Sequence, residues 1–248
     1  TGCGTCAAVC PSGAVFRDAH GRPVYRRELC AGCGLCADAC PGQARRLVGR
    51  WITVTEVMEE VQRDLPFFRR SGGGVTLGGG EPLFQAQFAS EVLEACRDQG
   101  IDTALETCGY APWPVVSDLC GRVDHVLFDV KHIDPGEHDR LTGVDNTRIL
   151  ANLEELARIH PDVVVRYPLI PGLNDSDAHV TRLARFLRGL KGVRLIEVLP
   201  YHRYGERKYE ILGRSYPLAG TAIPSASEVE HVCELVLAEG LECSRLAT

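Results

Sequence analysis

Short apolar runs alternate with longer amphipathic segments from about residue 53 to the end of the chain. Runs rich in β-branched residues predict strands at 75–77, 102–106, 125–130, 163–168, 193–199 and 241–246. Apolar residues at helical spacing predict helices at 54–64, 85–99, 114–120, 146–160, 175–190 and 225–239. Thr53 and Glu56 form a capping box before the first helix, and Gly100 ends the second. This alternation predicts βα units and a parallel sheet.

Polar signatures follow the predicted strands one after another. They are Gly-Gly-Glu, Glu-Thr-Cys-Gly, Asp-Val-Lys-His, Arg-Tyr and Pro-Tyr-His, in that order along the chain. A β/α barrel brings the carboxyl ends of all its strands to one mouth, whereas an open doubly wound sheet places its site at a single switch point. We therefore predict an α/β fold with a partial β/α (TIM-like) barrel over residues 50–248.

The cysteines are concentrated near the start, with seven of the twelve in the first 40 residues. A complete bacterial ferredoxin run, C-x2-C-x2-C-x3-C-P, ends at Pro41, and an equally spaced run that lacks its opening cysteine ends at Pro11. The fourth cysteine of each run crosses to the other cluster in such proteins. One 4Fe–4S cluster would use Cys3, Cys6 and Cys40, and the other Cys30, Cys33, Cys36 and Cys10. We expect residues 1–49 to form an inserted ferredoxin-like segment with two clusters.

A disulfide scaffold or a zinc site is the alternative for these cysteines. Nothing indicates an oxidising compartment, and zinc sites usually space their cysteine pairs more widely. The later cysteines have a different setting, because Cys96, Cys120, Cys233 and Cys243 lie within apolar patterns and are predicted to pack in the core. Cys108, beside Thr107 at a strand end, is also predicted to pack.

Composition and charge limit the class of protein and the partners to be expected. The 248 residues are 45% hydrophobic and 24% charged, which is typical of a globular protein. The net charge of −6 leaves no general basic footprint for nucleic acid, and no apolar run approaches the roughly 20 residues of a membrane span. No export signal is visible, so we expect a cytoplasmic protein with no membrane or nucleic-acid partner. The sequence opens at Thr1 inside a cysteine run, and we expect further residues before it.

Five stretches give the sequence a specific resemblance to a known family. They are SGGGVTLGGGEPL (71–83), ETCGYAPW (106–113), LFDVKHIDPGEHDRLTGVDN (127–146), VVRYPLIPGLND (164–175) and LPYHRYGERKY (199–209). With the tandem ferredoxin run, the sequence resembles an activating enzyme of glycyl radical enzymes, in the subgroup of the radical S-adenosylmethionine superfamily that carries a two-cluster insert. The resemblance implies a partial barrel and a third 4Fe–4S cluster, held by a C-x3-C-x2-C motif. This sequence lacks that motif, so we expect it in a preceding segment and expect residues 1–248 alone to be inactive.

The resemblance also implies ligands for the methionyl amino group of S-adenosylmethionine. Gly79, Gly80 and Glu81 would bind this group, because glycines allow a close approach and a carboxylate suits an ammonium. Glu106 and Thr107 would lie near the amino group and near a monovalent cation. The alternative for the Gly-Gly-Glu run is an anion-binding loop or a simple tight turn.

Further ligands are implied at the ends of the later strands. Asp129 and Lys131, with Val130 between them, would contact the ribose and the methionyl carboxylate, and Arg166 would face a carboxylate. His202 would contact the ribose, and Lys131 and His202 are the expected catalytic pair. The alternative for Asp129 and Lys131 is a purely structural ion pair, and a lone histidine is usually structural. His132 is expected just behind the site.

The implied activity is that of an oxidoreductase in anaerobic metabolism. S-adenosylmethionine would be reductively cleaved to methionine and a 5′-deoxyadenosyl radical, which would remove hydrogen from a glycine of a partner glycyl radical enzyme. The implied electron donor is a flavodoxin or a ferredoxin. Two alternatives are a radical enzyme acting on a small molecule and a ferredoxin-type electron-transfer protein with an inert barrel. The polar signatures argue against the latter, because electron transfer needs none of them.

Overall fold

The computed structural model describes residues 2–245. The chain forms two compact units, one comprising residues up to 52 together with 208–215, and the other comprising 53–207 together with the chain from 216 onward. No helix within residues 2–245 is long and apolar enough to cross a lipid bilayer.

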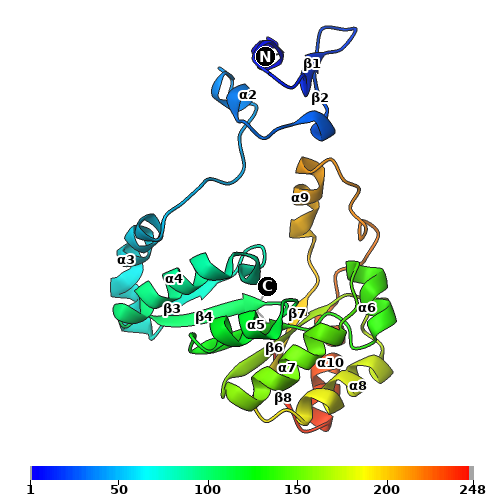
Figure 1. Ribbon diagram of the computed structural model, residues 1–248. Coiled ribbons are helices and arrows are strands. Elements are labelled where there is room, and N and C mark those ends of the chain that lie inside the picture. Colours follow the sequence, from blue (N-terminus) through cyan, green and yellow to red (C-terminus); the bar gives the residue numbers. More distant parts are fainter. Residues whose placement is uncertain (1, 246–248) are drawn as a thin grey trace. The chain divides into compact units, whose positions relative to one another are not determined.

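The larger unit is built on a parallel sheet of six strands (Figure 1). These are β3 (Gly74–Leu77), β4 (Asp102–Thr107), β5 (His125–Asp129), β6 (Val163–Leu169), β7 (Val193–Pro200) and β8 (Glu242–Arg245). Their order in the sheet is their order along the chain. A doubly wound sheet would reverse this order at a switch point, whereas a barrel does not. The predicted partial β/α barrel is therefore confirmed.

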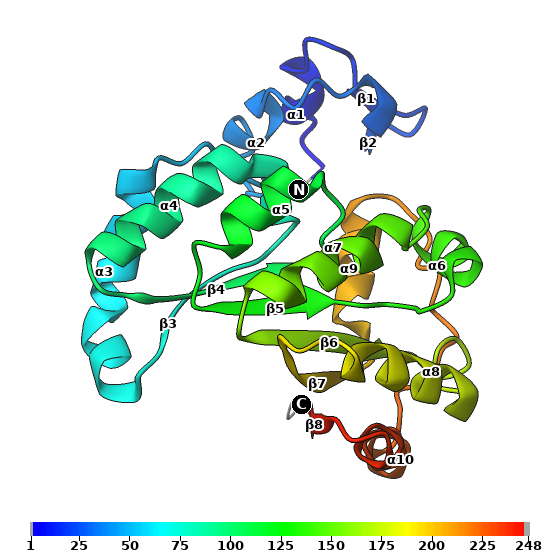
Figure 2. The same ribbon diagram turned by 60° about the horizontal axis from the view of Figure 1, so that its bottom comes forward.

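Helices cover one face of this sheet (Figure 2), as right-handed crossovers between adjacent parallel strands require. They are α3 (Val54–Ser71), α4 (Ala86–Asp98), α5 (Trp113–Cys120), α7 (Thr147–Ile159), α8 (Asp177–Arg188) and α10 (Ala226–Ala238). Alternate strand residues point into the layer between sheet and helices, and Leu105 and Phe128 are completely buried there. Cys96, Cys120 and Cys233 are buried as predicted, and Cys243 packs against the same core. The opposite side chains of each strand remain free to build a site.

Helix α3 is longer than predicted, because it continues through Pro66 to Ser71. The capping box of Thr53 and Glu56 forms as expected. A proline inside a helix removes one hydrogen bond and ordinarily ends or kinks it. Here the segment beyond the proline carries Phe68, which packs with Val61 against α4 and β3. Burial of this apolar face outweighs the lost hydrogen bond.

Several short helices were not predicted. They are α6 (Pro135–Thr142), α9 (Glu206–Ile211) and the 3-10 turns Arg27–Leu29, Pro82–Gln85 and Arg203–Gly205. The start of α6 is marked in the sequence, since Asp134 caps it and Pro135 occupies its first turn. The other predicted elements agree to within about two residues, and Leu246, at the end of the last predicted strand, lies outside the described residues.

The smaller unit repeats one local structure around its cysteines. Gly4 and Gly34 adopt the left-handed backbone conformation, with φ of 75° and 81°, and each begins a single helical turn. These turns are α1 (Thr5–Ala8), which carries Cys6, and α2 (Leu35–Asp38), which carries Cys36. An antiparallel hairpin of β1 (Val15–Arg17) and β2 (Pro23–Tyr25) lies between them along the chain. The two cysteine runs, which have the same spacing in the sequence, thus form the same backbone turn.

Candidate active site

Glu81 follows β3 and is held by the loop after β4. Its carboxylate accepts hydrogen bonds from the Thr107 hydroxyl at 2.6 Å and the Cys108 N–H at 2.9 Å, and it also accepts one from the Leu83 N–H at 3.3 Å. The structure therefore brings together two predicted site residues, Glu81 and Thr107. Burial, with Glu81 beside it, raises the pKa of Cys108 to about 11, so this thiol stays protonated at neutral pH.

Glycines at the strand ends make room for this arrangement. A side chain at Gly78 would lie 2.8 Å from a carboxylate oxygen of Glu106, and one at Gly109 would lie 2.2 Å from the ring of Phe128. Gly79 has a φ of 102°, which only glycine adopts readily, whereas Gly80 is surrounded by open space. Sequence reasoning selected Gly79 and Gly80 and missed Gly78 and Gly109. The available signal was their position, since Gly78 directly follows β3 and Gly109 lies two residues after β4.

A row of charges crosses the open face of the sheet from β4 to β7. Arg166 on β6 forms an ion pair with Glu106 on β4, and its Nε lies 3.7 Å from Glu197 on β7. Asp129 is the register partner of Arg166 on β5. Within residues 2–245, the Arg166 Nε–H is buried and has no hydrogen-bond partner. Arg166 thus faces two carboxylates of the protein itself, and its predicted contact with a cofactor carboxylate stays a prediction. Sequence reasoning missed Glu197.

The segment after β5 places one cation at the same end of the sheet. Lys131 Nζ lies 3.1 Å from Asp129 Oδ2 in a partly exposed pair. The charges of both Lys131 and Glu81 act on the Cys108 thiol. Val130 is completely buried with its side chain in the core. Its side chain therefore points away from this group, and its backbone N–H donates to the Arg166 carbonyl at 3.0 Å.

Two buried asparagines fix the backbone that carries Lys131. The Asn174 side chain donates to the carbonyls of Lys131 at 3.1 Å and Pro168 at 2.7 Å, and accepts from the Ile170 N–H at 2.8 Å. The Asn146 side chain donates to the His132 carbonyl at 2.8 Å. Both asparagines are at most 3% exposed. Sequence reasoning included both asparagines in its motifs but assigned no role to either side chain. The signal that could have indicated such a role was an amide side chain within a turn-forming loop.

His132, the residue after Lys131, is buried. Its ring centre is 4.0 Å from that of His179 on α8. Burial lowers the pKa of both imidazoles, that of His179 to about 4. Both rings are therefore neutral at physiological pH and contribute packing, while Tyr167 donates its hydroxyl to the Asn174 carbonyl beside them.

His202 lies beyond the end of β7 and is exposed. Its ring accepts a hydrogen bond from the Tyr204 N–H at 3.3 Å, and its centre is 4.3 Å from that of the Tyr204 ring. The contacts described for His202 stay within its own loop. The structure therefore places it at the carboxyl ends of the strands but does not join it to the group around Glu81, Lys131 and Arg166.

Two cysteines of the first N-terminal run come near cysteines of the second run. The charge of Cys3 acts on Cys40, and that of Cys10 acts on Cys30. Backbone N–H groups of Val15, Gly32 and Ala44 donate to the Sγ atoms of Cys10, Cys30 and Cys40 at 3.3–3.4 Å. The pKa of Cys10 is lowered mainly by the Val15 N–H, that of Cys30 by the Tyr25 hydroxyl, and that of Cys40 by the Ala44 N–H.

This donor set fits iron–sulfur clusters. Lowered pKa values favour the thiolate form, which is the form that binds iron. No disulfide forms within residues 2–245, which contain all twelve cysteines. In the same residues no three His, Cys, Asp or Glu side chains converge on one metal ion.

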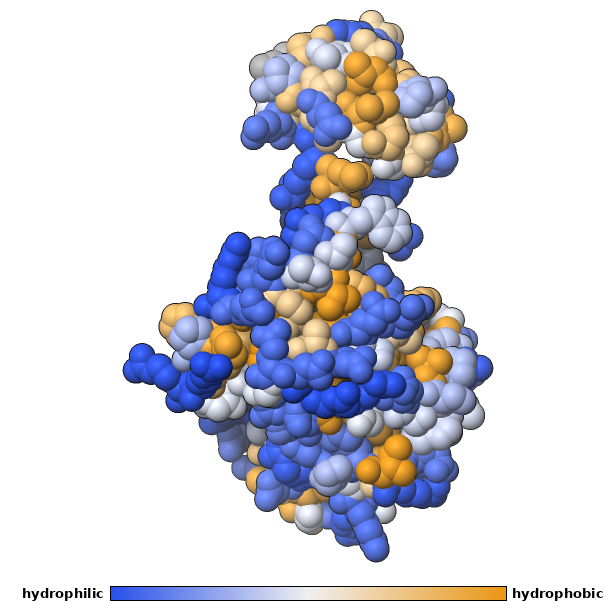
Figure 3. Space-filling view, turned by 60° about the vertical axis from the view of Figure 1, so that its left-hand side comes forward, coloured by the Kyte–Doolittle hydropathy of each residue, from blue (hydrophilic) through white to orange (hydrophobic). Residues whose placement is uncertain are grey.

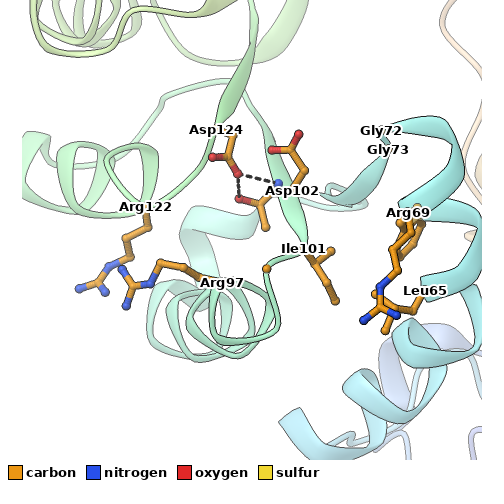
Figure 4. A pocket seen from close by; sticks show the side chains of 12 residues that line it. Leu65, Arg69, Gly72, Gly73, Arg97, Ile101, Asp102, Arg122 and Asp124 are labelled. Atoms are coloured by element: carbon orange, nitrogen blue, oxygen red, sulfur yellow. Dashed lines mark hydrogen bonds between the residues drawn. The ribbon is translucent and has the colours of Figure 1, made fainter.

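A cavity of about 460 Å³ lies at the amino ends of β3 and β4, away from these residues (Figure 4). Asp124, just before β5, binds β4 at this end by accepting hydrogen bonds from the Thr103 N–H at 2.8 Å and the Thr103 hydroxyl at 3.0 Å. Arg97 and Arg122 also line the cavity. Arg97 pairs with Glu94 three residues before it, and Arg122 pairs with Asp118 four residues before it. In a β/α barrel this end serves stability, whereas catalysis is found at the carboxyl ends. We therefore place the candidate site at the carboxyl ends.

Comparisons with known proteins identify the family of this chain. The model of the radical SAM superfamily matches residues 28–184, and that of a 4Fe–4S dicluster domain matches residues 1–44. The choline trimethylamine-lyase activating enzyme of Oleidesulfovibrio alaskensis is 45% identical over 93% of this chain and 76% of its own length. The benzylsuccinate synthase activating enzyme of Thauera aromatica is 38% identical over 97% and 75%. A domain of the pyruvate-formate lyase-activating enzyme of Bacteroides vulgatus superposes with a TM-score of 0.60, at 28% identity over 71% of this chain and 99% of that domain.

Proposed function

This chain belongs to the radical SAM superfamily, among the activating enzymes of glycyl radical enzymes, and on that basis we propose that it produces a glycyl radical on a partner enzyme. Its cofactors are 4Fe–4S clusters and S-adenosylmethionine. When bound, they supply a reducing electron and a 5′-deoxyadenosyl radical that removes hydrogen from carbon.

The observation that carries this proposal is the arrangement of opposite charges at the strand ends. The Glu81 carboxylate accepts hydrogen bonds and suits an ammonium group, whereas Lys131 and the Arg166 Nε–H, which forms no hydrogen bond within residues 2–245, suit a carboxylate. An α-amino acid carries both groups on one carbon, so it requires such a pair of complementary charges. This set therefore supports binding of the methionyl part of S-adenosylmethionine by Glu81, Lys131 and Arg166.

The same chain orients the side chains that would bind the cofactor. Thr107 and Cys108 hold Glu81 in one orientation, and Asn174 and Asn146 hold the backbone of the Lys131 segment. Side chains fixed by such contacts need little reorganisation when the ligand binds. His202 is assigned to the ribose, and Gly79 and Gly80 to the close approach of the amino group. A monovalent cation near Glu106 and Thr107, and a third cluster supplied by a segment outside residues 1–248, complete the proposal.

The experiment uses the polypeptide expressed from its complete gene and reconstituted with iron and sulfide without oxygen. Dithionite and S-adenosylmethionine are added, and 5′-deoxyadenosine is measured by chromatography. Candidate glycyl radical enzymes are then added, and a protein-based radical is measured by electron paramagnetic resonance. We expect both products, and a Glu81→Gln variant should lose both together.

Each alternative gives a different result. A radical enzyme that acts on a small molecule would form the nucleoside but no radical on any glycyl radical enzyme. An electron-transfer protein would form neither product while its clusters were still reduced. Either result contradicts the activase proposal, and the second also contradicts the assignment of Glu81 to cofactor binding.

A further inference from the structure

Three charged residues lie side by side across three neighbouring strands of the sheet. Strand register places Asp129 on β5 beside Arg166 on β6, and Arg166 beside Glu197 on β7. Successive side chains of a strand point to opposite faces of its sheet. Val165 and Val198, each next to a member of this row, are completely buried in the core. The three charged side chains therefore share the other face, which carries the candidate site.

Glu197 has the weakest attachment of the two carboxylates in this row. Asp129 lies 3.1 Å from Lys131, whereas the Glu197 carboxylate has a single partner within residues 2–245, Arg166 at 3.7 Å. The face of the larger unit seen in Figure 3 is largely hydrophilic, and charged side chains at such a surface are hydrated. The Glu197 side chain is only 23% exposed, and the loss of hydration on enclosing a carboxylate can exceed what one ion pair returns. Stability therefore does not explain this carboxylate.

The position of Glu197 matters for Arg166, because the guanidinium is otherwise held at one end. Its ion pair with Glu106 on β4 is made by Nη1. Its Nε–H is buried and forms no hydrogen bond within residues 2–245, and Glu197 Oε2 lies 3.7 Å from this nitrogen. A planar guanidinium held at one end can rotate about that contact, whereas carboxylates on both sides restrict its plane. Glu106 and Glu197 thus constrain Arg166 from two different strands.

We propose that Glu197 is a positioning residue, which keeps the Arg166 guanidinium in the orientation that binds the methionyl carboxylate of S-adenosylmethionine. This inference rests on the proposed function, which assigns that carboxylate to Lys131 and Arg166. Glu197 acts through Arg166 and needs no contact with the ligand. Without its charge the guanidinium follows Glu106 alone, so the site must reorganise before the ligand binds.

Two other roles for Glu197 give different results. A direct partner of the positive sulfonium would distinguish S-adenosylmethionine from S-adenosylhomocysteine, which has the same α-amino acid group but no sulfonium charge. A purely structural residue would change thermal stability and leave the affinity for both ligands unchanged. A positioning residue affects both ligands equally, and only while Arg166 is present.

The test is a double-mutant cycle on the reconstituted protein from its complete gene. The variants are Glu197→Gln, which removes the charge and keeps the size, Arg166→Ala, and the two together. Glu197→Asp keeps the charge on a shorter side chain and shows whether the charge itself is needed. Glu239→Gln is the matched control, because the Glu239 side chain is only 16% exposed and pairs with Arg185 of α8 at 3.0 Å. Iron content and melting temperature are measured for every variant.

Affinities for S-adenosylmethionine and S-adenosylhomocysteine are measured by calorimetric titration, which requires no turnover. We expect Arg166→Ala to lower both affinities about 10- to 100-fold and Glu197→Gln to lower both about tenfold. The double variant should bind no more weakly than Arg166→Ala, because Glu197 then has no guanidinium to orient. Glu197→Asp should bind more tightly than Glu197→Gln, and Glu239→Gln should bind like the wild type.

Three results would overturn the positioning role. Losses that multiply in the double variant would make Glu197 an independent ligand, and so would a loss for S-adenosylmethionine alone. Unchanged affinity in Glu197→Gln, beside weakened binding in Arg166→Ala, would leave Glu197 a structural residue. Normal binding of both ligands by Arg166→Ala would instead contradict the assignment of Arg166 in the proposed function. The activase reaction is tested separately, through 5′-deoxyadenosine and the radical on the partner enzyme.

Discussion

Replacing Asn174 by alanine tests whether the backbone clamp behind Lys131 serves the cofactor site. Asn174 is 3% exposed, and its side chain contacts the Lys131 and Pro168 carbonyls and the Ile170 N–H. Alanine removes all three hydrogen bonds at once. The bond from the Tyr167 hydroxyl is kept, since it ends on the backbone carbonyl of residue 174.

The magnitude follows from the groups left without partners. Each buried polar group that loses its hydrogen bond costs about 1–3 kcal/mol. Some of these groups are only partly buried and regain water, so we expect a total of about 2–4 kcal/mol. For a domain of this size 1 kcal/mol shifts the melting temperature by about 2–4 °C, which gives a fall of about 5–15 °C. A loosened Lys131 segment should also lower the affinity for S-adenosylmethionine about tenfold, equivalent to about 1.4 kcal/mol.

The assay combines thermal unfolding with calorimetric titration of S-adenosylmethionine, on reconstituted protein well below its melting temperature. Asp124→Ala is the matched control, because it removes two hydrogen bonds to Thr103 at the opposite ends of the strands. This control should lose stability but keep its affinity. The reasoning is refuted if Asn174→Ala melts lower with unchanged affinity, or if both variants lose affinity equally.

Three further predictions follow from individual contacts. Lys131→Ala and His202→Ala should each weaken S-adenosylmethionine binding about 10- to 100-fold in calorimetry with iron content unchanged, since charge-assisted contacts contribute about 1.5–3 kcal/mol. The control, Cys96→Ala in the core, should leave the affinity unchanged. Asp162 raises the pKa of His125 above 6.5, so the stability that this pair contributes is complete below pH 6.5 and is lost as the pH rises through the raised pKa. The denaturant midpoints of the wild type and of His125→Gln should therefore converge at high pH, whereas a constant difference between them at every pH would contradict this. Gly109→Ala should lower the free energy of unfolding by about 1–3 kcal/mol more than Gly172→Ala does. Both glycines have a positive φ, but of the two only Gly109 lies against a ring, that of Phe128. Equal unfolding free energies of the two variants would contradict this and show that the ring moves aside.

The order of strands and helices could be predicted because it depends on residues close together in the sequence. The capping box of Thr53 and Glu56 spans one helical turn, and the apolar run of β6 specifies a largely buried strand. A barrel was distinguished from an open sheet by the even placement of polar motifs after successive strands. Helix α3 was predicted too short, because Pro66 is a local signal and the burial of Phe68 against α4 is a tertiary one.

The candidate site was only partly predictable. Motifs identified Glu81, Thr107, Asp129 and Lys131, and the structure pairs the first with the second and the third with the fourth. The pairing of Arg166 with Glu106 and its approach to Glu197 depend on strand register, which no motif states. Gly78 was missed because the need for a small residue there arises from Glu106 on the neighbouring strand.

The sequence by itself determined the cysteine spacing, the βα alternation and the residue types at the strand ends. Spacing is a covalent property, and amphipathic periodicity is preserved in any fold that buries one face of each helix. The tertiary structure alone decided which of these residues touch. Asn174 reaches the Lys131 carbonyl across 43 positions of sequence, and Cys40 comes under the charge of Cys3 from the other end of its unit. Such contacts exist only once the strands have paired and the chain has turned, because hydrogen bonds and ion pairs act over a few ångströms of space and not along the chain.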